Sequence, residues 1–72
     1  MVDVNKLRGK LAERRMSFEQ LASKMDLSTS TIYRKINENG ETITVVEANK
    51  IVEILELDPA EAMSIFFSQF VA

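Results

Sequence analysis

The chain has 72 residues, 46% of them hydrophobic and 28% charged, with a formal net charge of −2, which suits a single soluble domain spanning residues 1–72. It contains neither cysteine nor histidine, which excludes disulfides and thiolate or imidazole metal sites and removes the commonest general base. No apolar run approaches the roughly 20 residues that span a bilayer, and the basic N-terminal segment lacks a signal-peptide pattern, so we expect a cytoplasmic protein.

The first predicted helix begins after an N-cap at Asp3 and ends near Arg14. Its predicted buried side consists of Val4, Leu7, Leu11 and Ala12. Gly9 lies inside this helix and should cost about 1 kcal/mol relative to alanine. The sequence leaves open whether Gly9 permits a close approach of another backbone.

The second predicted helix begins at Phe18, because Ser17 and Gln20 have the spacing of a capping box. The side chains expected on its buried side are Leu21, Ala22 and Met25. Asp26 then falls where the chain must turn, and aspartate tolerates the left-handed backbone region better than most residues. Leu27 is the apolar residue of that turn.

A third helix is predicted from a cap at Ser28 or Thr29 to about Asn37, with Ile32 and Ile36 facing inward. Asn39-Gly40 interrupts the pattern, and residues 38–44 form the longest irregular segment.

Two further helices follow, each with its own start signal. Thr44 and Glu47 have capping-box spacing, and Asp58-Pro59 places an N-cap before a proline at the first helical position. The apolar stripe of the fourth helix is Ala48, Ile51, Val52 and Leu55. The fifth helix, at about 59–70, carries Met63, Phe66, Phe67 and Phe70. The predicted fold class is therefore all-α, with five short helices.

The charge is divided unevenly along the chain. Residues 1–37 contain eight Lys and Arg against four acids, whereas residues 38–72 contain one Lys against seven acids. Such a division can present a positive face to a polyanion and turn a negative face away. The alternative is the uneven scatter of charge that any small domain can show.

Residues 17–37 have the apolar spacing of a helix-turn-helix. The matching positions are Leu21, Ala22, Leu27, Ser28, Ile32 and Asn37. On these residues the segment resembles the helix-turn-helix of the lambda-repressor-like family, also called the XRE or Cro/CI type. One helix before the motif and two after it also fit that family, and residues 4–10 and 65–67 resemble small regulators of phage or mobile-element origin. The competing interpretation is a pair of packed helices without a role in DNA binding.

The resemblance implies which residues meet double-stranded DNA. Those expected at base edges are Thr29, Ser30, Thr31, Tyr33 and Arg34. Those expected at the sugar-phosphate backbone are Ser17, Ser28, Lys35 and Asn37. The paired donors of Arg34 suit guanine O6 and N7, and threonine methyls suit the thymine methyl. Alternatively, Arg34 and Lys35 form a solvated face and Tyr33 is a partly packed surface side chain.

The sequence departs from the family pattern in three places, at position 18, in the loop after the third helix and at the turn. Phe18 stands where the family often has a glutamine that grips phosphate. Glu38 and Glu41 occupy a loop in which basic residues are common, and acids there would repel phosphate. Asp26 replaces the usual turn glycine. The first two departures predict a modest affinity for DNA or a loop that points away from it.

The apolar stripe at the C-terminal end has two interpretations. Met63, Phe66, Phe67 and Phe70 either complete the core or remain partly exposed as a homodimer contact. A dimer suits a helix-turn-helix protein, since one recognition helix reads only about half a turn of DNA.

We therefore expect a small sequence-specific transcriptional regulator, a repressor rather than an activator. An enzyme is poorly supported, because no acid pair or glycine-rich phosphate loop stands out. No cofactor, metal, small-molecule ligand or membrane partner is expected. The alternative function is a protein-interaction module, antirepressor-like or antitoxin-like, that uses the same scaffold without reading DNA.

Overall fold

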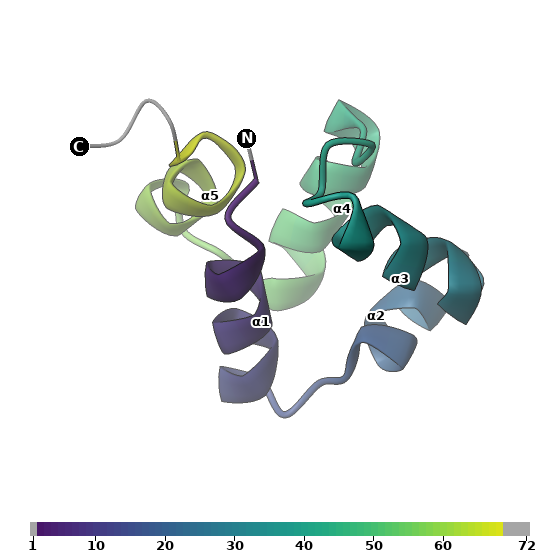
Figure 1. Cartoon of the computed structure of the whole chain (residues 1–72). Coiled ribbons are helices and arrows are strands. Elements are labelled where there is room, and N and C mark those ends of the chain that lie inside the picture. The colour runs from purple at the N-terminus through teal and green to yellow at the C-terminus, as the bar shows by residue number, and fades with distance from the viewer. Residues whose placement is uncertain (1, 69–72) are drawn as a thin grey trace.

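The computed structural model describes residues 2–68, which form five helices and no strand (Figure 1). The helices are α1 (Val4–Glu13), α2 (Phe18–Lys24), α3 (Thr29–Asn37), α4 (Val45–Leu55) and α5 (Pro59–Phe66). In Figure 1, α2 and α3 lie on the side of the molecule away from α5, and α4 lies between them. The predicted all-α class is confirmed.

Every helix begins with the side-chain cap that the sequence predicts. The five N-caps are Asp3, Ser17, Ser28, Thr44 and Asp58. Each accepts a hydrogen bond from the backbone N–H three residues later, which satisfies a donor that has no partner within the helix. In α2, α4 and α5 the glutamine or glutamate at that position returns a bond to the cap, completing a capping box.

The first four helices end in the same way, and the sequence signals this only in part. A residue other than glycine adopts positive φ after each helix: Arg15 (54°), Asp26 (58°), Asn39 (58°) and Glu56 (52°). The next residue donates its N–H to a carbonyl five positions back, as Leu27 does to Ala22 at 2.9 Å. This is a Schellman motif. The left-handed turn was predicted at Asp26, whereas Arg15 and Glu56 have no residue-type preference that announces it.

A single hydrophobic core receives side chains from all five helices. Its fully buried members include Leu7, Leu21, Ile32, Ile51, Leu55 and Ile65. Ala12, predicted to face inward, is exposed. The buried line of α1 follows Leu7 and Leu11, and the small alanine methyl loses little by facing water.

The apolar stripe of the last helix is only partly buried. Ile65 and Phe66 are buried and Ala62 packs against the core, whereas Met63 and Phe67 are about half exposed. Ile65 faces inward because α5 lies beside the start of α1, where the Asp3 N–H donates to the Ile65 carbonyl at 2.6 Å (Figure 1). The predicted stripe therefore divides, with Phe66 in the core, and Phe70 lies outside the described residues.

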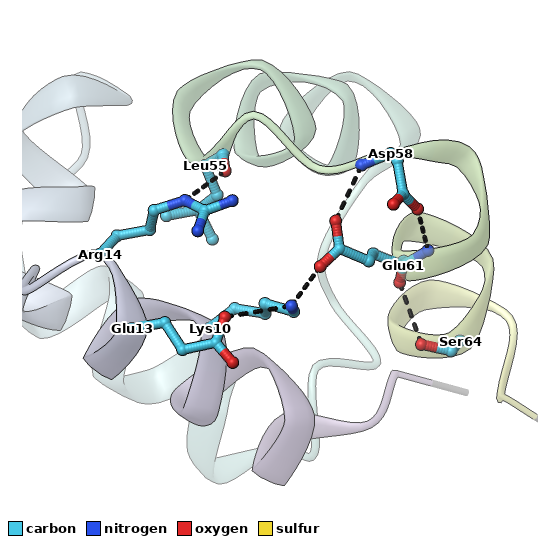
Figure 2. Close-up of polar contacts among 7 residues, drawn as sticks. All are labelled: Lys10, Glu13, Arg14, Leu55, Asp58, Glu61 and Ser64. Carbon is cyan, nitrogen blue, oxygen red and sulfur yellow. Dashed lines mark hydrogen bonds and ion pairs between the residues drawn. The ribbon is translucent and has the colours of Figure 1, made fainter.

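Two cations of α1 tie that helix to α4 and α5 (Figure 2). Arg14 Nε donates to the carbonyl of Leu55, the last residue of α4, at 3.0 Å. Lys10 Nζ forms an ion pair with Glu61 of α5 and a second one with Glu13 at 3.1 Å. The hydrogen bond between Lys10 and Glu61 raises the pKa of Lys10 and lowers that of Glu61.

These contacts fix α1, α4 and α5 as a support for the other two helices. Within residues 2–68, no helix is both long and apolar enough to cross a membrane.

Candidate nucleic-acid interface

The helix-turn-helix consists of α2, a tight turn at residues 25–28 and α3. Leu21 and Ala22 of α2 are buried against the core that also contains Ile32 and Ile36 of α3. Ala22 is 1% exposed, so a larger side chain at this position would push the helices apart. Positive φ at Asp26 reverses the chain within this short turn.

One face of α3 is turned to solvent. Its exposed residues are Thr29, Ser30, Tyr33, Arg34 and Asn37. They recur at intervals of three and four residues, which places them on one side of a helix. Ile32 and Ile36 occupy the opposite side. Five of the residues expected to meet DNA are therefore brought together on one accessible surface.

The hydroxyls at the start of α3 divide into two groups. Ser28 Oγ accepts the N–H of Thr31 at 3.1 Å and donates to Thr31 Oγ1 at 2.7 Å. Ser30 Oγ lies 3.2 Å from Ser28 Oγ, and the Thr29 side chain is exposed. Ser28 and the partly buried Thr31 hold the first turn together, and Thr29 and Ser30 are presented beyond them.

Tyr33 both packs against α2 and reaches solvent. Its ring lies 6.0 Å from the Phe18 ring, between centroids, at an interplanar angle of 58°. Its hydroxyl donates to the Glu19 carboxylate, and this hydrogen bond raises the pKa of the phenol. The side chain is 41% exposed, so enough of it remains accessible to contact DNA.

Lys35, expected at the DNA backbone, instead binds inside the protein. It is 9% exposed; its Nζ donates to the Thr42 carbonyl at 2.9 Å and lies 3.2 Å from the Glu47 carboxylate. Burial alone would raise the pKa of Glu47, but the hydrogen bonds from the Thr44 N–H and from Lys35 hold it below its ordinary value of 4.5. The sequence carried a signal for this placement, since Lys35 follows Ile32 by three positions.

Arg34 remains at the surface beside the acidic loop. Its guanidinium lies 3.8 Å from the Glu38 carboxylate, and both side chains are well exposed. Exposed pairs of this kind contribute about 0–1 kcal/mol, so Arg34 can exchange this partner for DNA. The loop packs closely against the N-terminal segment at Gly40. Only glycine fits there, because a Cβ would lie 2.7 Å from Val2 Cβ.

Ser17 and Asn37, the other two expected backbone contacts, are both exposed. Ser17 Oγ caps α2 by accepting the Gln20 N–H at 3.1 Å. Phe18, in place of the family glutamine, is 8% exposed and belongs to the core.

Arg8 is a further candidate contact, which the sequence did not indicate. Its guanidinium carbon lies 5.7 Å from the centroid of the Phe18 ring, an arrangement that attracts a cation to the face of an aromatic ring. Only the unusual phenylalanine at position 18 hinted at such a partner. Within the described part of the chain, no group of three or more acidic side chains could hold a metal ion.

One family of known domains matches most of the chain. Residues 6–68 match the sequence profile of the Cro/C1-type HTH DNA-binding domain. The chain belongs to this family. The match extends from α1 to beyond the end of α5 and so includes the helix-turn-helix and its support. No curated protein and no solved structure matched the chain.

Membership confirms the resemblance found in residues 17–37, and the family consists of DNA-binding domains rather than enzymes. The exposed face of α3 carries five of the residues expected to meet DNA.

Proposed function

We propose that this Cro/C1-type domain binds double-stranded DNA sequence-specifically and regulates transcription, with α3 lying in the major groove. The observation that carries the proposal is the exposed face of α3, where Thr29, Ser30, Tyr33, Arg34 and Asn37 occur together. A major groove admits one α-helix, and small polar and basic side chains can reach its base edges.

In this proposal Arg34, Thr29 and Ser30 read base edges and Tyr33 lies beside them. Arg34 supplies two parallel donors for a guanine, and Thr29 offers both a hydroxyl and a methyl group. Ser17 and Asn37 meet the sugar-phosphate backbone on either side. Ser28 and Thr31 act on the same surface by fixing the first turn of α3.

We further propose that the domain acts as a homodimer and as a repressor. Met63 and Phe67 are 46% and 49% exposed on α5, and apolar side chains of this size favour a contact with a second copy. A dimer would read two half-sites. Occupying a promoter is enough to block transcription, whereas activation requires an additional contact with the transcription machinery.

The test is an in vitro selection from random duplex DNA at about 0.15 M salt, the physiological range. We expect enrichment of an inverted repeat whose half-sites lie about 10 base pairs apart, one helical turn. A single enriched half-site would retain sequence-specific binding and remove the dimer. No enrichment by protein shown to be folded would refute the proposal.

A second candidate is a protein-interaction module. The feature that favours it is the exposure of Val45 and Val46, 75% and 64%, in addition to Met63 and Phe67. The salt dependence of the binding affinity distinguishes the two candidate functions. DNA binding through several phosphates weakens steeply between about 50 and 200 mM salt, whereas an apolar protein contact changes little.

A further inference from the structure

A cleft of about 510 Å³ lies between the first turns of α1 and the end of α3. Its polar lining includes Asn5 and Arg8 from α1, Asn37 from the last position of α3, and Asn39 from the turn that follows. Segments that are about thirty residues apart in the sequence therefore share one concave surface.

The chemistry of this cleft suits a phosphodiester. Three amide side chains can donate hydrogen bonds to oxygen, and Arg8 adds a planar guanidinium that matches a phosphate. Asp3 is the one carboxylate of the cleft lining. It keeps its negative charge, and its Oδ1 accepts the N–H of Lys6 at 3.0 Å as the N-cap of α1, where the helix dipole favours an anion.

Arg8 is held in place without being neutralised. It lies over the Phe18 ring at 5.7 Å, and this ring is itself fixed in the core. Among residues 2–68, no carboxylate lies within ion-pairing distance of its guanidinium. A cation that is oriented by an aromatic ring and has no acidic partner keeps its charge available for an anion.

The position of Arg8 relates it to the proposed interface. Phe18, which it covers, directly follows Ser17, and the cleft that it lines contains Asn37. Arg8 is therefore close to both segments that carry the residues proposed to meet the DNA backbone. The expected cation of this region, Lys35, is turned inward to Glu47.

We propose that this cleft binds a phosphate of the DNA backbone, with Arg8 as the residue that neutralises it and Asn37 and Asn5 as hydrogen-bond donors. The proposal rests on the proposed function and deepens it, because it extends the interface from the helix-turn-helix onto α1. Arg8 takes over the phosphate contact for which Phe18 has no polar group. It adds affinity without adding sequence preference, since phosphates carry no base identity.

The experiment measures dissociation constants between about 50 and 200 mM salt on two duplexes, the selected site and one of unrelated sequence. The test variant is Arg8→Met, whose apolar chain still covers Phe18 but carries no charge. The matched control is Lys6→Met, an exposed cation on the same helix that does not line the cleft. Arg8→Lys tests whether a positive charge at this position is enough.

For Arg8→Met we expect about tenfold weaker binding to both duplexes, and a salt-dependence slope smaller by about 1. Arg8→Lys should recover the slope, and Lys6→Met should change neither quantity by as much. Equal effects of Arg8→Met and Lys6→Met would overturn the phosphate site and leave the proposed function standing. Weaker binding of Arg8→Met to the selected duplex only, with an unchanged slope, would overturn it in favour of a base contact. Failure of the wild-type protein to bind either duplex would refute both proposals.

Discussion

Five cations of the N-terminal half divide into two sets: an inward set, whose charged groups bind partners on other helices, and an outward set, whose charged groups have no partner or only a weak one. Lys10, Arg14 and Lys35 are bound to Glu61, to the Leu55 carbonyl and to Glu47 respectively, so their charge holds helices together. Arg8 and Arg34 point outward, one over an aromatic ring and the other beside a loosely paired glutamate.

This division shows that charge counted along a sequence overstates the charge offered to a partner. Arg34 and Lys35 are neighbours in α3, yet one is exposed and the other is 9% exposed. One position corresponds to about 100° of rotation around a helix. That rotation is enough to change a surface cation into a structural one.

The largest effect should come from removing an inward cation. Lys35→Ala leaves the Glu47 carboxylate partly buried without its ion-pair partner, and should lower the free energy of unfolding by about 3 kcal/mol. Urea denaturation followed by circular dichroism measures this. Arg34→Ala is the matched control on the neighbouring residue and should change stability by less than about 0.5 kcal/mol. Equal free energies of unfolding for the two variants would contradict the division into inward and outward cations.

Removing the outward neighbour should affect DNA rather than stability. Arg34→Ala is expected to weaken binding to the selected site by about 1–3 kcal/mol and to relax the preference at one base pair. Titration of fluorescent duplexes carrying each of the four base pairs at that position would measure both effects. If Arg34→Ala discriminates among the four duplexes as the wild type does, Arg34 does not read a base.

Lowering the pH should reduce the difference in the free energy of unfolding between the wild type and Lys35→Ala. The pKa of Glu47 is lowered in the folded protein, so its pairing stabilises the fold above the ordinary pKa of 4.5 and is lost as the pH falls through the folded value. Urea denaturation of both proteins from pH 7 downward should show a difference in the free energy of unfolding that is largest near neutral pH and decreases below about pH 4.5. A gap that widens in acid would rule out the Glu47 pairing as its source.

The smallest effect should come from an exposed cation with a strained backbone conformation. Arg15 has φ of 54°, which costs a side-chain-bearing residue about 1–2 kcal/mol relative to the right-handed region. Arg15→Gly should therefore raise the free energy of unfolding by about 0.5–1 kcal/mol, after the greater flexibility of glycine in the unfolded chain is counted. Arg15→Ala has the same loss of charge but keeps the strained φ. If both variants are equally stable, charge rather than backbone geometry determines the result.

Most of the secondary structure was predictable from short-range signals. The N-caps and the inward positions of Leu7, Leu21 and Ile32 followed from residue types three and four positions apart. Gly9 shows the limit of such signals. The sequence could not say whether it faces another backbone, and the structure leaves open space around it, with no atom within 4 Å of a Cβ built there.

The sequence by itself determined the five helix starts, the turn at Asp26 and the family to which residues 6–68 belong, because capping, turn chemistry and apolar periodicity act between near neighbours. The tertiary structure decided which charges are available. Helical spacing from Ile32 can place Lys35 on the inward side of α3. The partner that holds it, and whether Arg8 is offered outside, depend on how helices distant in the sequence pack, which no local pattern encodes.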